Sequence, residues 1–285
     1  MKKIAIIFHS NDEKRTHLYA ITYLANFWKQ EGIEVNFIYG PEHFRYADIA
    51  ILHIDLSIVP DNYLAFAKKY PYTLNRKVRD IRKSTFSKHI LLLDNKYEGK
   101  VIIKSNLNYA GLPERIFTNQ ERNLTCSVIQ KRISELKKKV LYSRFLRNDY
   151  EIQFNSPNDY IILDSPEFVP KQWYKREDIV IEQFLPEFDG EHYCVRNYFF
   201  LGDQSVCILR KSTHPIVNQS STVSIETVQV HREIEALRRK LNFDYGKFDY
   251  VVHNNIPILL DVNKTTGAPA SPYNPIYLDQ RRKFG

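Results

Sequence analysis

The chain has 285 residues, of which 43% are apolar and 13% aromatic, and it carries a formal net charge of +8. This composition excludes a disordered or fibrous protein, and the length is sufficient for two or three packed units, as in many enzymes. The positive charge favours anionic partners, but the Lys and Arg residues are spread along the chain without a basic tail. That distribution argues against a nucleic-acid-binding protein.

Cysteine usage and hydropathy favour a cytoplasmic protein. Cys126, Cys194 and Cys207 are odd in number and lack any Cys-x-x-Cys spacing, so neither a disulfide framework nor a thiolate metal site is expected. The apolar run at the start of the chain is too short for the core of a signal peptide, and no apolar run of about 18 residues occurs anywhere. We therefore expect no membrane span and no membrane partner.

The first 77 residues alternate short apolar strands with helices whose apolar residues recur every three or four positions. The pattern predicts strands at 2–8, 34–40, 47–55 and 72–75 and helices at 17–32 and 60–70. Alternation of this kind predicts a small parallel sheet. No Gly-x-Gly-x-x-Gly motif is present, so a dinucleotide site in this segment is not expected.

The rest of the chain has a different order of expected helices and strands. A helix leading into a strand is expected at 80–95, strands at 100–106, 159–165, 178–185, 192–203 and 206–212, helices at 127–147 and 231–242, and a strand pair at 246–264. Consecutive strands joined by tight turns predict an antiparallel sheet in the last third of the chain. The fold class expected for the whole chain is therefore α/β followed by α+β.

The strand pair at 246–264 carries three oxygen-bearing side chains among apolar residues. If its turn occupies residues 254–256, Asp249 lies directly opposite Asp261, and Asn263 lies on the same face. Two opposed carboxylates repel each other unless a cation lies between them, and Asp, Asp and Asn suit a hard divalent cation such as Mg²⁺. The alternative is an ordinary polar face of an edge hairpin, and a register that differs by one residue would break the geometry.

Two further segments have residue types that suit a nucleotide. Lys104 interrupts an apolar strand, where a cation is costly unless an anion such as a phosphate pairs with it, and the polar loop 106–111 that follows has backbone NH groups for phosphate oxygens. The alternative for Lys104 is an edge position from which its ammonium group reaches solvent. Apolar side chains and carboxylates after the strand at 178–185 suit an adenosine, although a solvated turn explains the carboxylates equally well.

Together these segments resemble the ATP-grasp superfamily. An apolar strand with a lysine, a short polar loop, a strand ending Glu-Gln-Phe-Leu, then "YGKFDYVV" and "LLDVN" follow one another in the order of that fold. The resemblance covers roughly residues 78–267. It implies a pre-ATP-grasp α/β domain at 1–77, an ATP-grasp N-terminal subdomain with a long insertion at 78–180, and a C-terminal subdomain at 181–285.

The resemblance also implies roles for individual residues, with ATP held between the two subdomains and magnesium between the phosphates and the C-terminal hairpin. The implied metal ligands are Asp249, Asp261 and Asn263. The implied phosphate contacts are Lys83 and Lys104, with Lys88 as the alternative to Lys83. The implied adenine contacts are Glu182, Gln183, Phe184 and Leu185. The implied ribose contact is Glu191, with Glu187 as its substitute. Arg196 and Arg210, on strands expected to face the same side, resemble arginines that stabilise charge on the transferred phosphoryl group.

The activity implied is ATP- and Mg-dependent ligation of a carboxylate to an amine through an acyl phosphate, with a peptide or amino-acid-like acceptor. A kinase acting on an anionic hydroxyl substrate and a non-catalytic nucleotide-binding protein are the alternatives, and the protein is expected as a monomer or a homodimer. His53, Asp55 and His214 could contact substrate, although a core-edge role explains His53 and Asp55 better. The loop 106–111 departs from the family in having one glycine, Gly111, where relatives have two or three.

Overall fold

The computed structural model describes residues 2–118, 154, 156 and 159–267, so the helix expected at 127–147 lies outside the described residues. The chain forms two compact units. One comprises residues 1–88 together with 185–285, and the other comprises residues 89–184. The three-part division implied by the resemblance stays a prediction.

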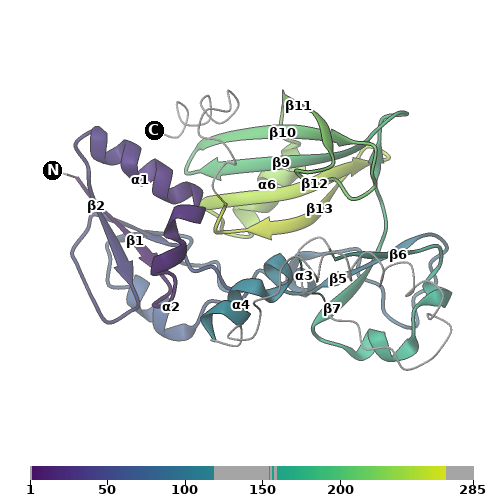
Figure 1. The fold of residues 1–285 in the computed structure, drawn as a ribbon, viewed down its shortest axis with the longest axis horizontal. Coiled ribbons are helices and arrows are strands. Elements are labelled where there is room, and N and C mark those ends of the chain that lie inside the picture. The colour runs from purple at the N-terminus through teal and green to yellow at the C-terminus, as the bar shows by residue number, and fades with distance from the viewer. Residues whose placement is uncertain (1, 119–153, 155, 157–158, 268–285) are drawn as a thin grey trace, which may run out of the picture. The chain divides into compact units, whose positions relative to one another are not determined.

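The N-terminal part of the first unit is a four-stranded parallel sheet, as predicted (Figure 1). Its strands lie in the order β2-β1-β3-β4. The elements are β1 (Lys3–Phe8), α1 (Ala20–Gln30), β2 (Glu34–Tyr39), β3 (Ile49–Leu52), α2 (Asp61–Ala67) and β4 (Tyr72–Leu74), with a short 3₁₀ turn, η1 (Glu13–Leu18), before α1. Alternate residues of β1 enter two separate apolar clusters, one with α2 and the other with α1, so the two helices cover opposite faces of the sheet.

The C-terminal part of this unit is an antiparallel sheet, also as predicted. The strands β11-β10-β9-β12-β13 lie in that order, and β8 pairs with β9 (Figure 1). The elements are β8 (Glu187–Phe188), β9 (Tyr193–Leu201), β10 (Gln204–Ser212), β11 (Thr222–Val228), α6 (Arg232–Lys240), β12 (Tyr245–His253) and β13 (Ile256–Asn263).

One face of the antiparallel sheet is apolar and the other is largely polar. Tyr198, Phe200, Phe248 and Tyr250 pack in one cluster with Ile234 of α6. Because side chains alternate along a strand, the residues between these aromatic positions lie on the opposite face. The alternation of "FDY" in β12 therefore places Asp249 on the face away from α6.

The second unit is built on a three-stranded antiparallel sheet with the order β6-β5-β7. Its elements are β5 (Val101–Ser105), η2 (Asn108–Gly111), α4 (Leu112–Phe117), β6 (Ile161–Leu163), η3 (Pro166–Phe168), η4 (Lys171–Lys175) and β7 (Ile179–Gln183). Trp173 is 2% exposed within the apolar cluster of this unit. Within the described part of the chain, no helix is both long enough and apolar enough to cross a membrane.

The helix and strand expected at 80–95 are much shorter than predicted. The helix is α3 (Lys83–Phe86), and Ile90 makes only an isolated bridge to Glu182. Leu91 is 6% exposed and enters the apolar cluster of the second unit, whereas Leu92 and Leu93 are 66% and 47% exposed, so the run lies mainly at the surface after Leu91. Periodicity could not separate this exposed run from a strand because both are short and rich in leucine.

Candidate active site

The hairpin of β12 and β13 places Asp249 directly opposite Asp261, which confirms the predicted pairing. The turn itself differs from the prediction. It consists of Asn254 and Asn255, both with positive φ (50° and 64°), as a two-residue hairpin turn requires. The register then shifts between Asp249 and Tyr250, which pairs with Leu259. This β-bulge compensates for the shorter turn and brings the two carboxylates back into opposition.

Three further polar residues lie on the same face of the sheet as the two carboxylates. Asn263 lies opposite Lys247, and Asn197 of β9 lies opposite Asp249. Residues directly opposite each other in an antiparallel pair share a face, as do residues two apart on one strand. The register therefore confirms that Asp249, Asp261 and Asn263 share a face, whereas their metal binding stays a prediction.

Cations and an amide compensate the opposed carboxylates. Lys247 Nζ lies 2.8 Å from Asp249 Oδ2, and Asn197 Nδ2 donates to Asp249 Oδ1 at 2.6 Å. On the other strand, Lys83 Nζ lies 3.4 Å from Asp261 Oδ1. Repulsion between facing carboxylates would destabilise the hairpin, and these contacts reduce it.

Lys247 and Asn197 were not predicted from the sequence. Lys247 could have been found, because it lies two residues before Asp249 and alternation alone gives it the same face. Asn197 could not, since β9 and β12 are not consecutive and their register depends on the whole sheet. Lys83 was predicted as a phosphate-binding residue. It is 5% exposed beside Asp261, whereas Lys88 is exposed, so the geometry favours Lys83 over its alternative.

The donor set fits magnesium. Mg²⁺ prefers oxygen ligands and is commonly held by one or two carboxylates together with phosphate oxygens and water. Asp249 and Asp261 supply the carboxylates, and Asn263 supplies an amide oxygen. Over residues 2–118 and 159–267, no cluster of three or more His, Cys, Asp or Glu side chains is arranged to hold a metal. The protein's share of the coordination would thus be the two carboxylates and the amide.

The two arginines expected to face the same side of the sheet lie on opposite faces, so that prediction is wrong. Arg210 pairs with Val195, and Arg196 pairs with Leu209 and Tyr250. Residues 195 and 196 point to opposite faces because side chains alternate along β9. Arg210 therefore shares the face of the carboxylates, and its Nε donates to Asn197 Oδ1 at 2.7 Å.

Arg196 has a structural partner on the other face. Its guanidinium binds Glu187 through two hydrogen bonds, of 3.1 and 2.5 Å. Glu187 also accepts from the Val252 NH at 2.7 Å. These hydrogen bonds join the segment after β7 to β9 and to the end of β12. Because Glu187 makes all of them, it is not available to a ribose. Glu191, the first choice for the ribose, has a side chain that is 85% exposed in the turn before β9.

In the second unit, Lys104 and Glu182 form a buried ion pair. Lys104 Nζ lies 2.7 Å from Glu182 Oε2, and the two residues are 5% and 3% exposed. The expectation that a cation on this strand needs an anionic partner is confirmed, and the partner is Glu182. The other carboxylate oxygen, Glu182 Oε1, is buried without a hydrogen-bond partner among the described residues. A buried acceptor of this kind is costly unless a ligand donor reaches it.

The backbone after Glu182 has one open donor. The NH groups of Gln183 and Phe184 bond to the carbonyls of His89 and Lys100, at 2.9 and 2.8 Å. Across the described residues, the Leu185 NH makes no hydrogen bond. Among the linker residues predicted at the adenine, Gln183 and Phe184 therefore have engaged NH groups, and Leu185 has an open one.

The loop that follows β5 has an unusual backbone. Tyr109, Ala110 and Gly111 all have positive φ (48°, 55° and 70°), although only the last is glycine. A left-handed conformation costs roughly 1–2 kcal/mol at a non-glycine residue, so the surrounding structure must impose it. Arg115 contributes by donating to the Ala110 carbonyl at 2.8 Å. The loop therefore holds three consecutive left-handed residues with one glycine among them.

Of the two histidines considered as substrate contacts, His53 lies in the core and His214 lies at the surface. His53 is fully buried among aromatic rings, including those of Phe8 and Tyr19, and neither ring nitrogen has a hydrogen-bond partner in the part of the chain described. Burial, followed by the nearby Lys264 charge, lowers the pKa of His53 to about 3, so its ring is neutral. His214 is exposed.

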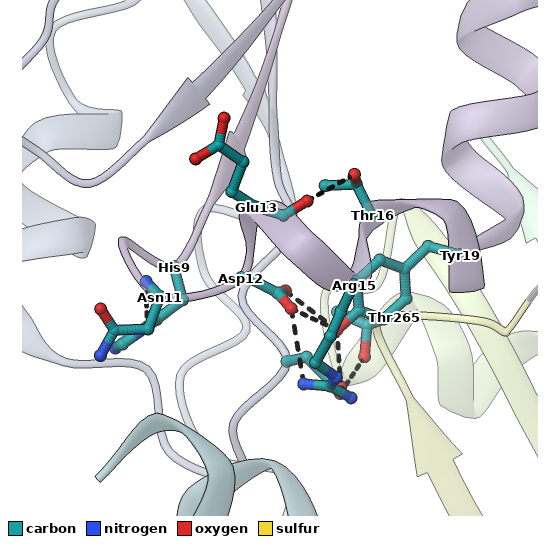
Figure 2. Close-up of polar contacts among 9 residues, drawn as sticks. His9, Asn11, Asp12, Glu13, Arg15, Thr16, Tyr19 and Thr265 are labelled. Atoms are coloured by element: carbon teal, nitrogen blue, oxygen red, sulfur yellow. Dashed lines mark hydrogen bonds and ion pairs between the residues drawn. The ribbon is translucent and has the colours of Figure 1, made fainter. Parts of the chain in front are cut away.

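A buried polar cluster connects the loop after β1 with the end of β13 (Figure 2). The Tyr19 hydroxyl lies 3.0 and 2.9 Å from the two oxygens of Asp12 and 2.9 Å from Asp55 Oδ2. Arg15 bonds to both carboxylates, at 3.4 and 3.2 Å. The Thr265 hydroxyl donates to Asp55 Oδ1 at 2.7 Å. The cluster was not predicted, because Asp55 and Thr265 lie far in the sequence from Asp12, Arg15 and Tyr19.

Protonation of Asp12 in this cluster makes the free energy of unfolding depend on pH. Burial raises the pKa of Asp12 to about 7, while the Tyr19 hydrogen bond and the Arg15 charge act in the opposite direction. A carboxyl whose pKa is raised by folding binds its proton more tightly in the native state, so stability falls as pH rises from about 4 to about 7. We expect Asp12→Asn to remove this decline.

The measurement is thermal unfolding of wild type and Asp12→Asn at pH 5 and pH 8. The variant should gain stability relative to wild type by roughly 2 kcal/mol on going from pH 5 to pH 8. A difference between the two proteins that is the same at both pH values would show that Asp12 does not titrate in this range.

Comparisons with known proteins gave structural matches only. No protein-family model matches the sequence, and no curated protein matches it. The structure is similar to D-alanine–D-alanine ligase from Bacillus anthracis complexed with ATP (12% identity, 100% of this chain, 94% of that chain, TM-score 0.43). It is also similar to a RimK domain ATP-grasp protein from Sphaerobacter thermophilus (8%, 99%, 95%, 0.46) and to the ATP-grasp ligase PsnB complexed with minimal precursor, Mg and ADP (10%, 94%, 90%, 0.48).

Proposed function

We propose that the protein is an ATP- and Mg-dependent ligase that joins a carboxylate to an amine through an acyl phosphate. The observation that carries this proposal is the direct opposition of Asp249 and Asp261, with Asn263 on the same face. A purely structural sheet gains nothing from two facing carboxylates that need compensation by lysines. A divalent cation bound by nucleotide phosphates gives this arrangement a use.

The surrounding cations suit a phosphoryl transfer. Lys83 is buried beside Asp261, and Arg210 lies on the same face as the carboxylates. Such groups can bind phosphate oxygens and neutralise the charge that develops on the transferred group. Magnesium, when bound, would supply further charge neutralisation. We propose Lys83 and Arg210 as the phosphate-binding residues of the first unit.

The end of β7 and the segment after it offer further donors and acceptors that suit a nucleotide. The unsatisfied Glu182 Oε1 can accept from an amino group such as that of adenine, and the open Leu185 NH can donate to a ring nitrogen. Lys104, which pairs with Glu182, is proposed to bind a phosphate. Glu191, whose side chain is 85% exposed, is proposed at the ribose. A cytoplasmic location stays our expectation.

The chemical reason for the acyl phosphate is the poor reactivity of a carboxylate toward an amine. Attack of the carboxylate on the γ-phosphorus releases ADP and gives a mixed anhydride, and attack of the amine on the acyl carbon then releases phosphate. Positioning and charge neutralisation suffice for both steps, so no protein nucleophile is needed. We propose a peptide or an amino acid as the amine acceptor.

The test is product analysis with purified protein, ATP, MgCl₂ and panels of acids and amines. A ligase releases ADP and phosphate only when both an acid and an amine are present, and hydroxylamine in place of the amine yields a hydroxamate. ADP formation with a phosphorylated hydroxyl product would overturn the ligase in favour of the kinase. Nucleotide binding without turnover across the panels would overturn it in favour of a non-catalytic protein. Asp249→Asn is the control for contaminating activity.

A further inference from the structure

Asn263, the amide member of the proposed magnesium site, is held by a residue two positions further along the chain. The Thr265 NH donates to Asn263 Oδ1 at 2.8 Å, and the Thr265 hydroxyl oxygen lies 3.2 Å from the same atom. Thr265 is 3% exposed. The segment after β13 therefore curls back on the side chain that ends the strand.

This contact determines which atom of the Asn263 amide faces Thr265. A backbone NH can only donate, so the atom in front of it must be the amide oxygen and not the NH₂ group. An amide oxygen has two lone pairs, and one hydrogen bond leaves the second available to a cation. The hydrogen bond from the Thr265 NH therefore holds the Asn263 amide with its oxygen toward Thr265.

The position of Thr265 depends in turn on Asp55. The Thr265 hydroxyl has one hydrogen, and its shorter contact, 2.7 Å, is to Asp55 Oδ1. A hydrogen bond to a carboxylate is stronger than one to a neutral oxygen, so the hydroxyl donates to Asp55 rather than to Asn263. The other oxygen of Asp55 accepts hydrogen bonds from Tyr19 and Arg15. A chain of contacts within the first unit therefore runs from the loop after β1 to Asn263.

We propose that Thr265 is a positioning residue for the magnesium site, and that Asp55 holds it in place. This inference rests on the proposed function. The loop after β1 would then contribute to metal affinity without touching the metal. Groups that orient a metal ligand typically change metal affinity 10- to 100-fold. Neither residue would take part in the chemistry itself.

The experiment measures binding of Mn²⁺ to protein saturated with ADP, by the loss of the free Mn²⁺ signal in electron paramagnetic resonance. Thr265→Val keeps the shape of the side chain but removes the hydroxyl, and it should raise the Mn²⁺ dissociation constant about 10-fold. Thr265→Ser keeps the hydroxyl and should stay within about twofold of wild type. The affinity for ADP without metal should not change in either variant.

Thr266→Val is the matched control. Thr266 is also buried, but its hydroxyl bonds to the Tyr245 hydroxyl at 3.0 Å instead of to Asp55. Its loss should cost comparable stability in urea unfolding while leaving Mn²⁺ affinity unchanged. Equal affinities for wild type and Thr265→Val, or an equal loss in Thr266→Val, would overturn the positioning role while leaving the proposed function intact. If wild type with ADP binds no Mn²⁺, the proposed function and this inference fail together.

Discussion

Replacing Asp261 with Asn is expected to reduce turnover by roughly 100- to 1000-fold with little effect on folding. The substitution keeps the shape of the side chain and removes one of the two charges that would hold the cation. Stability should change by less than about 1 kcal/mol, because the lost 3.4 Å contact with Lys83 is offset by the lost repulsion from Asp249. The measurements are ADP release under the conditions of the product analysis and urea unfolding of the same preparation.

Asp203→Asn is the matched control for Asp261→Asn. Asp203 is exposed in the turn between β9 and β10 of the same sheet, so the identical change there should alter neither turnover nor stability. Turnover of Asp261→Asn within about threefold of the control would remove Asp261 from the mechanism. A large loss of stability in Asp261→Asn would show that the carboxylate serves the fold.

Replacing Lys104 with Met should weaken both nucleotide binding and the fold. Methionine fills a similar volume but leaves Glu182 charged and buried, which typically costs about 3–5 kcal/mol. Loss of the ammonium group should also raise the ADP dissociation constant at least about 10-fold, because a charge-assisted contact with phosphate disappears. Urea unfolding and calorimetric titration with ADP measure the two effects.

A double variant separates the two consequences. In Lys104→Met with Glu182→Gln, both charges of the pair are gone, so much of the stability should return. Nucleotide affinity should not return, because neither replacement supplies a cation. Wild-type affinity in the double variant would show that Lys104 serves only to neutralise Glu182.

The sequence predicted the hairpin better than its turn. Alternation of polar and apolar residues identified β12 and β13 as a strand pair with Asp249 and Asp261 at polar positions. Two consecutive asparagines, Asn254 and Asn255, suit the positive φ angles of a two-residue turn, which the prediction missed. The bulge beside Asp249 cancelled the resulting one-residue error in register. A bulge has no strong signal in local sequence, so the agreement depended on a feature that could not be predicted.

Features that depend on non-consecutive strands were less accessible. The different faces of Arg196 and Arg210 follow from the register of β9 with β10, which counting from a motif does not give. Asp55 and Thr265 lie far apart in the sequence, so no local pattern predicts their contact. Lys104 was recognisable as an exception in an apolar strand, but its partner emerged only from the pairing of β5 with β7.

The most direct test of the account is a calorimetric titration of the wild-type protein with a nonhydrolysable ATP analogue, in the presence of MgCl₂ and again in the presence of EDTA. We predict binding that is at least about 10-fold tighter with magnesium, and loss of that difference in Asp261→Asn. Binding that is equally tight with and without magnesium, or no binding at all, would contradict the claim that the opposed carboxylates hold a divalent cation for a nucleotide.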